Sequence, residues 1–587
     1  MLPGLLIGLL VGAKGMADWS IQVGGIQDGT YPAGNGIVHD YAGGAFIAGD
    51  FSGNVSFGAT RLTARGSVAA FVMHVTASGA IDWVIQVDGT DEAKAHAIAD
   101  DDRGGVLVTG EFRGMASFGS TTLASRPDST NAFLMRVTAM GAIDWAVQVE
   151  GSLGCMSTGY GVANDGVGGA LVTGAFSGNA TFGGRSLASR NSDAFVMHVT
   201  RLGVIAWVTH LGGAFEDLAR GIVADGMGGG FVTGEFRGQA TFGATTLTSR
   251  GAADAFVVRV TESGVIEWAA SVLATTNSYG YGIATDGVGG AHVTGKFRGL
   301  AMFGSTSLSG FDFYDVFVMH VTAYGVIDWA VQAGGTSSDG GYGITTDGVG
   351  GALVTGGFRS EATFGPTVLT SEGLSDVFVM HVTALGVIDW AVKAGGKLEG
   401  AGFGIALKVY PDTFMVGIAR PNNTIQGALV TGYFKGSELF GFKTYSSGGT
   451  SCFIASLMPP PSLPPMPPLM QPPPLSPLPP MSWGPHSPPA SPPLPEPAPP
   501  LSPLPPMSWG PHSPPASPPL PEPAPPLSPL PPMSWGPHSP PASPPLPEPA
   551  PPLSPLPPMS WGPHSPPARP PLPEPAPPLS PLPPMSW

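Results

Sequence analysis

The sequence has few cysteines throughout and few prolines in its first 458 residues. Cys155 and Cys452 are the only cysteines among 587 residues and fall at non-equivalent positions, so no disulfide framework is expected. Six of the 67 prolines precede residue 459, and the other 61 fall in the last 129 residues. Because so proline-rich a segment cannot form a packed core, we expect a globular region over residues 18–457 and a low-complexity tail over residues 458–587.

Charged residues are also scarce, and acidic ones predominate. They make up 11% of the chain, and the formal net charge is −16. Nucleic acid and anionic membranes attract cationic surfaces, so neither is an expected partner. The apolar run from Leu2 to Ala13 is too short to cross a bilayer, and no transmembrane segment is predicted. Its length suits the apolar part of a signal peptide, so residues 1–17 are interpreted either as a signal peptide or as a worn strand, meaning a repeat strand whose sequence has diverged.

Motifs for catalysis, metals and nucleotides are absent as well. The chain has no GxSxG, HExxH or P-loop motif, which favours a non-catalytic protein with no cofactor. Calcium is the alternative, because an aspartate recurs at the first expected hairpin of six repeats. One carboxylate per loop falls short of the roughly six to eight oxygens that calcium requires, and aspartate also favours turns by bonding its own backbone. The recurring aspartates are Asp40, Asp101, Asp165, Asp225, Asp286 and Asp347.

What the chain does contain is a long internal repeat, marked by one tryptophan per copy. The tryptophans are spaced by 61 to 64 residues, which indicates a repeat architecture. Each copy reads as four short strands joined by glycine-rich turns, without helical periodicity. We therefore predict an all-β, seven-bladed β-propeller of four-stranded blades, with a β-solenoid as the alternative. The tryptophans are Trp19, Trp83, Trp145, Trp207, Trp268, Trp329 and Trp390.

Side-chain alternation assigns roles to two recurring positions. Ile81, Trp83 and Ile85 share one face of the fourth strand, so the seven tryptophans are predicted to pack in the core between adjacent blades. The third strand carries a recurring histidine or arginine. Equivalent positions on different blades are too far apart to share a metal ion, so these side chains are interpreted as sheet-face residues between blades. They are His74, Arg136, His198, Arg259, His320 and His381.

The two ends of the globular region each contain part of a repeat. The last copy stops after its third strand, Cys452 to Leu457, whereas Met16 to Val23 reads as a fourth strand without the preceding three. Pairing of these two segments would complete the last blade and close the ring, which removes free sheet edges. We therefore predict closure by the N-terminal strand.

The segment DAFVMHVTRLGVIAWVTHLGG, Asp193 to Gly213, is followed by RGIVADGMGGGFVTGEF, Arg220 to Phe236, and together they resemble SBBP β-propeller repeats. The resemblance covers about residues 14 to 457. It implies a propeller fold, frequent in surface or secreted proteins, and brings no catalytic residues. An insertion from about Val409 to Gln426 departs from the pattern. The tail repeats a 26-residue unit and resembles hydroxyproline-rich glycoproteins of plant and algal walls.

The links between the fourth strand and the next repeat differ most among the copies, and variable loops on a rigid scaffold are typical of a binding surface. The leading hypothesis is a secreted or cell-surface binding or structural glycoprotein. Its propeller head binds protein or glycan through these links, and its proline-rich stalk binds wall or matrix material. Three N-glycosylation sequons favour the secretory route. They begin at Asn54, Asn179 and Asn422.

Two other functional classes remain open. A propeller-fold hydrolase or lyase would need acidic link residues such as Glu216, Asp217 and Asp339 as its acid and base. A cytoplasmic scaffold would use PxxP elements of the tail to bind SH3-type domains.

The tail should be dispensable for folding, because a polyproline segment buries little surface. A chain that ends at Met458 is expected to melt at the temperature of the full-length chain, as measured by scanning calorimetry. A loss of many degrees would show that the tail stabilises the globular region.

Overall fold

The computed structural model describes residues 16–25, 30–310, 312–396, 398–407, 428–440 and 443–458. Every secondary-structure element in these ranges is a β-strand, and all of them belong to one compact unit within residues 1–475. Accordingly, no helix in the described ranges could cross a membrane. Residues 1–15 of the predicted signal peptide or worn strand, the insertion from Val409 to Gln426 and residues 459–587 of the predicted tail lie outside the described residues, so the interpretations of these segments stay predictions.

One antiparallel four-strand order recurs along the described chain, as in β2–β3–β6–β7. The first strands are β2 (Ala33–His39), β8 (Glu92–Asp100), β15 (Ser157–Asn164), β19 (Leu218–Ala224), β26 (Asn277–Thr285), β32 (Gly340–Thr346) and β38 (Gly400–Leu407). The second strands are β3 (Ala45–Phe51), β9 (Val106–Arg113), β16 (Ala170–Phe182), β20 (Gly230–Phe236), β27 (Ala291–Arg298), β33 (Ala352–Phe358) and β39 (Ala428–Phe440).

The third and fourth strands complete each sheet toward the outside. The third strands are β6 (Ala69–Val75), β12 (Thr130–Val137), β17 (Arg185–Val199), β23 (Asp254–Val260), β30 (Asp315–Val321), β36 (Asp376–Val382) and β40 (Lys443–Met458). The fourth strands are β7 (Ile81–Gly89), β13 (Ile143–Gln148), β18 (Ile205–Gly213), β24 (Ile266–Ser271), β31 (Ile327–Gly335), β37 (Ile388–Gly396) and β1 (Met16–Gly25).

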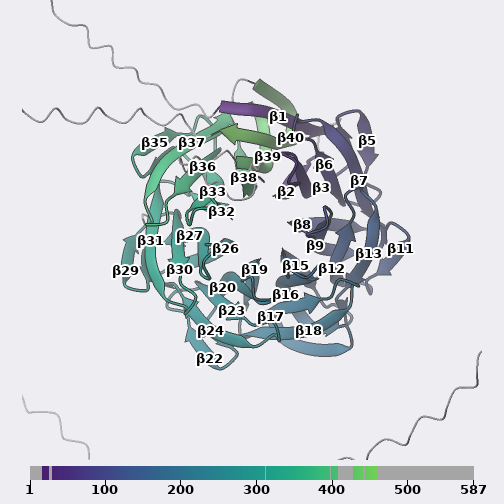
Figure 1. Cartoon of the computed structure of the whole chain (residues 1–587), viewed down its shortest axis with the longest axis horizontal. Coiled ribbons are helices and arrows are strands. Elements are labelled where there is room, and N and C mark those ends of the chain that lie inside the picture. Colours follow the sequence, from purple (N-terminus) through teal and green to yellow (C-terminus); the bar gives the residue numbers. More distant parts are fainter. Residues whose placement is uncertain are drawn as a thin grey trace, which may run out of the picture. The chain divides into compact units, whose positions relative to one another are not determined.

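The first strands stand side by side around a central axis, and the other strands of each sheet lie progressively further out (Figure 1). Each first strand contacts the first strand of the next sheet, and β38 contacts β2. This contact returns the series to its start, so the sheets form a closed ring. The fold is a β-propeller, and the solenoid alternative is wrong.

Strand β1 completes the last sheet. It pairs with β40 in antiparallel register, with Ala17 opposite Leu457 and Val23 opposite Cys452. The pairing predicted from the two incomplete repeats is therefore confirmed. Both cysteines of the chain are buried and free.

The stretch between the second and third strands forms an additional β-hairpin in each copy. A phenylalanine from this hairpin enters the core of the sheet. Phe364, for example, is fully buried, and its ring centroid lies 5.6 Å from that of Phe358 and 4.8 Å from that of Phe378. The separate hairpins are β4 (Asn54–Phe57) with β5 (Thr60–Thr63), β10 (Met115–Phe118) with β11 (Thr121–Ala124), β21 (Gln239–Phe242) with β22 (Thr245–Thr248), β28 (Leu300–Phe303) with β29 (Thr306–Ser309), and β34 (Glu361–Phe364) with β35 (Thr367–Thr370).

The same hairpins connect neighbouring sheets. Strand β10 pairs with the end of β7 in the preceding sheet, through Ala116 and Gly89, and β34 pairs with the end of β31 in the same way. In two copies the hairpin is continuous with the long strands β16–β17 and β39–β40. Two short strands, β14 (Glu150–Gly151) and β25 (Leu273–Ala274), take the place of the end of a fourth strand.

Loss of β1 should open the ring. A chain that begins at Gly24 leaves the backbone edge of β40 unpaired and lacks the half-buried Trp19, whose loss should cost less than the roughly 3–5 kcal/mol typical of a fully buried aromatic. We expect it to aggregate or to dimerise by strand exchange, as measured by size-exclusion chromatography and thermal melting. A chain that begins at Lys14 keeps β1 and is the control. A monomeric Gly24 chain with an unchanged melting temperature would contradict closure by β1.

Candidate functional site

Each first strand contains a β-bulge at the same point, and one residue is left unpaired there. In β26, for example, the pairing with β27 shifts between Gly280 and Gly282, so Tyr281 is the extra residue. Bulges of this kind re-aim a side chain and are common beside functional sites. We call the seven bulged residues the axial ring: Asn35, His96, Tyr160, Arg220, Tyr281, Tyr342 and Phe403.

The residue after each bulge is a glycine, or Ala97 in β8, because neighbouring first strands nearly touch there. A Cβ added to Gly282 would lie 2.8 Å from the carbonyl oxygen of Tyr342, and one added to Gly343 would lie 2.6 Å from that of Phe403. Backbone contact this close leaves no room for most side chains. The glycines therefore bring the bulged residues of successive strands within reach of one another.

Consecutive members of the axial ring contact each other. The ring centroids of His96 and Tyr160 are 5.7 Å apart, those of Tyr281 and Tyr342 are 5.4 Å apart, and those of Tyr342 and Phe403 are 5.7 Å apart. The guanidinium carbon of Arg220 lies 5.5 Å from the ring centroid of Tyr160 and 5.3 Å from that of Tyr281. Six of the seven residues, all except Tyr342, line a cavity of about 190 Å³ that we call the axial cavity.

Arg220 is held in place by a buried carboxylate. Its Nε and Nη2 atoms donate hydrogen bonds of 2.8 and 2.6 Å to the two carboxylate oxygens of Glu235, a side chain that is only 3% exposed. Burial alone would lower the pKa of Arg220, but the hydrogen bonds and charge of Glu235 outweigh it and raise the pKa. The guanidinium is therefore a fixed positive charge, and it lies over the rings of Tyr160 and Tyr281.

A second carboxylate, the half-buried Glu111, lies beside His96 of the axial ring. It accepts a 2.6 Å hydrogen bond from Thr158 Oγ1 and lies within 3.8 Å of His96 Nε2 and 3.5 Å of Lys94 Nζ. Burial raises the pKa of Glu111, but these partners outweigh it and lower the pKa to about 2. This wall of the cavity therefore carries balanced charges.

At the other end of the sheets, the recurring hairpin aspartates form clusters with the third-strand histidines and arginines. Asp347 Oδ1 accepts hydrogen bonds from the backbone N–H groups of Val349 and Gly351. Its Oδ2 atom lies 3.0 Å from His381 Nε2, while His381 Nδ1 lies 2.7 Å from Asp389 Oδ1 on the fourth strand. Burial lowers the pKa of His381, but the two aspartates outweigh it and raise the pKa above its usual value.

Equivalent bridges occur in other sheets, with Arg136 between Asp101 and Asp144 and with Arg259 between Asp225 and Glu267. Each links elements of a single sheet. These bridges do not exclude the interpretation of these side chains as sheet-face residues between blades, because His198 stacks on Trp207, which packs on the following sheet; that interpretation stays a prediction.

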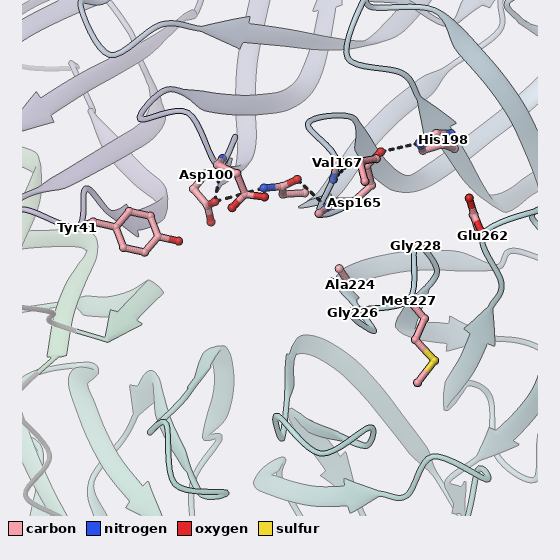
Figure 2. Close-up of a pocket in the computed structure, with 13 residues that line it drawn as sticks. Tyr41, Asp100, Asp165, Val167, His198, Ala224, Gly226, Met227, Gly228 and Glu262 are labelled. Atoms are coloured by element: carbon pink, nitrogen blue, oxygen red, sulfur yellow. Dashed lines mark hydrogen bonds and ion pairs between the residues drawn. The ribbon is translucent and has the colours of Figure 1, made fainter. Parts of the chain in front are cut away.

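A broader cavity of about 480 Å³ lies among the hairpins at this end (Figure 2). Tyr41, Asp100 and Asp165 line it, and Asn164 Nδ2 donates a 3.4 Å hydrogen bond to Asp100 Oδ1. Its carboxylates are largely occupied by turn N–H groups and by His198. In the described ranges, no group of three or more His, Cys, Asp or Glu side chains is placed to hold a metal ion, and the absence of a cofactor stays a prediction.

The tryptophans lie where adjacent sheets meet. Trp207 is buried and the other six are half-buried. Each ring from Trp19 to Trp329 packs on a turn glycine of the following sheet, so that a Cβ added to Gly264 would lie 2.8 Å from the ring of Trp207. The Nε1 atoms of Trp83, Trp207 and Trp268 donate hydrogen bonds to backbone oxygens of the same turns.

The predicted glycosylation sites differ in accessibility. Asn179 is exposed in the hairpin part of β16. Asn54 is half-buried in β4 and accepts a 2.6 Å hydrogen bond from Thr63 Oγ1. Asn422 lies outside the described residues.

The structure does not bring the proposed acid and base residues together. Asp217 and Asp339 are buried in links of two non-adjacent sheets, and each accepts hydrogen bonds from two backbone N–H groups. Burial raises the pKa of both to about 7, as expected for carboxyl groups that stabilise a loop from inside. Glu216 forms a surface ion pair with Arg237 at 3.0 Å.

No family model matches the chain, so the resemblance to SBBP repeats stays a prediction. No curated protein matches it either. Among solved structures, the chain is similar to the Neurospora crassa Pan2 WD40 domain, with a TM-score of 0.36 and 9% identity over 74% of this chain and 95% of that chain. A protein of unknown function from Bacteroides caccae gives a TM-score of 0.27 and 11% identity over 55% and 89%. Both scores are low, so the propeller assignment rests on strand order and ring closure.

The axial ring was missed at the level of sequence, although a signal was present. The residue before the conserved-looking Gly-Ile or Gly-Val pair changes in almost every copy, whereas its neighbours stay the same. A variable position inside an otherwise constant inner strand indicates a residue that the fold does not constrain.

His292 is a buried polar residue next to one of the histidine clusters. It is 1% exposed, neither ring nitrogen has a hydrogen-bond partner, and its ring centroid lies 5.0 Å from that of His320. Burial, followed by the charge of His320, lowers the pKa of His292 to about 4. Leu353 occupies the equivalent position of the next sheet, opposite His381.

The substitution His292→Leu should stabilise the protein, and more at pH 5 than at pH 8. Between the folded pKa and the usual value of about 6.5, the unfolded chain binds a proton that the folded chain does not. The wild-type protein therefore loses about 2 kcal/mol by pH 5, and the variant keeps it. Urea unfolding at both pH values measures the difference. An equal gain at both would contradict the assigned pKa.

Proposed function

We propose that this chain is a seven-bladed, SBBP-type β-propeller that acts by binding a protein or glycan and not by catalysis. The ligand is held at the axial cavity and by the links that border it. The carrying observation is the axial ring, in which a bulge aims a residue that varies among copies toward the axis in every first strand. A scaffold that keeps its frame constant and varies its inward-aimed residues is suited to recognition.

The cavity wall and the links are continuous. The backbone oxygen of Tyr314 accepts a 2.7 Å hydrogen bond from Asp339 N, in the link between β31 and β32. The ring of Tyr314 lies 5.9 Å from that of Tyr279, and Tyr279 is 6.3 Å from Tyr281 of the axial ring. A ligand at the cavity would therefore also touch the residues that differ most between copies.

A non-catalytic role is supported by the acidic residues themselves. Asp217 and Asp339 accept hydrogen bonds from backbone donors, and Glu235 and Glu111 lie against cations, so all four carboxylates take part in structural interactions. We further propose a secreted or cell-surface location, with the proline-rich tail as a stalk. The exposed Asn179 supports it.

The test is to screen the full-length protein against glycan and protein arrays and to measure the best ligand with two variants. Tyr281→Ala removes an axial-ring residue and should weaken binding at least about tenfold, as expected for an aromatic anchor. Val288→Ala changes an 89% exposed residue of a hairpin at the other end and should leave affinity unchanged. Thermal melting verifies that both variants are folded.

The proposal fails if binding is lost with Val288→Ala and kept with Tyr281→Ala. It also fails if the protein chemically converts the ligand, or if no ligand is found on either array.

A further inference from the structure

One lysine beside the axial ring contacts three aromatic rings, and among the described residues it has no carboxylate partner. Lys296 Nζ lies 4.8 Å from the ring centroid of Tyr314, 5.4 Å from that of Tyr281 and 5.5 Å from that of Tyr279. Lys296 is half-buried on β27, and among the described residues no carboxylate lies within ion-pair distance of it. We call Lys296 and these three tyrosines the lysine cage.

Nearby carboxylates are already committed to other cations. Glu235 is bound by both nitrogen positions of Arg220, Glu111 by Lys94 and Thr158, and Glu399 by Lys435 at 3.0 Å and by the hydroxyl of Tyr433 at 3.0 Å. Lys296, in contrast, has no carboxylate within ion-pair distance among the described residues. Burial lowers its pKa, which indicates that the ammonium has lost water without gaining a counter-ion.

From this geometry we infer that an acidic saccharide, a sugar ring that carries a carboxylate, binds at the lysine cage, whose Tyr281 also lines the axial cavity. This inference rests on the proposed binding function and specifies its ligand. The carboxylate is bound by Lys296 in a charge-assisted hydrogen bond, and the sugar ring lies against the tyrosine faces of the cage and the axial ring. Tyrosines supply both apolar faces and polar hydroxyl groups, which suits a ring that is itself apolar on one face and polar at its edge.

The charge distribution argues against a polyanion. The chain carries a net charge of −16, and the carboxylates of Glu235 and Glu111 lie against Arg220 and His96 of the axial ring. A phosphate backbone would meet these carboxylates after one favourable contact. A ligand with one isolated carboxylate and an otherwise neutral, hydroxylated body fits this site.

The experiment is calorimetric titration of the full-length protein with a disaccharide that carries a single uronic acid and with the neutral disaccharide of the same linkage. We expect the acidic saccharide to bind at least about tenfold more tightly. Lys296→Met keeps the apolar stem within the cage and should remove that advantage, leaving the two saccharides within about threefold. Lys435→Met removes an equal charge from an exposed residue of β39 and should preserve the advantage.

Equal binding of both saccharides by the wild-type protein would overturn the inference. This comparison needs no variant, so the inference can be tested even if the Lys296→Met protein does not fold. The inference is also overturned if Lys435→Met has the larger effect, or if the ligand bound at the cavity is a peptide. A neutral or peptide ligand that maps to the axial ring would still support the proposed binding function, whereas the absence of any ligand at the ring would refute both.

Discussion

The close approach of the first strands at the axis is the constraint on which the rest of the structure depends. Strands that meet backbone to backbone need a glycine at the point of contact, and Gly161, Gly221, Gly282 and Gly343 each face a carbonyl oxygen of the following strand. The pairing with the second strand cannot remain regular there, and a bulge leaves one residue out of register. The side chain at this position differs among the copies, and in two of them a carboxylate of the same sheet binds it: Glu235 binds Arg220, and Asp50 binds Asn35.

Further out, the sheets are held together by contacts that repeat at each boundary. A tryptophan of one sheet covers a turn glycine of the next, and an inserted hairpin pairs with the end of the preceding fourth strand. The boundary closed by β1 uses the same contacts, because Trp19 lies against Gly79 and Gly24 pairs with Ser56 of β4. Closure therefore adds one more copy of an existing interface.

Much of this architecture could be predicted from the sequence. The regular spacing of the tryptophans and the two-residue alternation located the four strands, and the incomplete repeats located the closing pair. The hairpin that contains Phe364 was not predicted, because its strands are too short to show a clear side-chain alternation. Only the burial in the structure shows that the phenylalanine enters the core. The clusters around His74 and His381 also escaped prediction, because they join residues 34 positions apart whose proximity depends on strand order.

The direction of the axial-ring side chains could not be predicted, for a different reason. Alternation assigns a side chain to one of two sheet faces, and a bulged residue belongs to neither. Its direction follows from contact between sheets, which no single repeat contains. The contacts of Arg220 with Tyr160 and Tyr281 likewise join three separate copies.

The central claim is that the copies close into one ring in a defined register, and a disulfide trap tests it most directly. Val23 lies opposite Cys452 in the β1–β40 pair, and opposed residues in antiparallel strands have Cα separations that a disulfide can span. The substitution Val23→Cys, refolded in a glutathione buffer and digested for mass spectrometry, should give a disulfide between residues 23 and 452, with Cys155 left free. Monomeric protein in which both thiols stay reduced, or a link from residue 23 to Cys155, would contradict the closed ring.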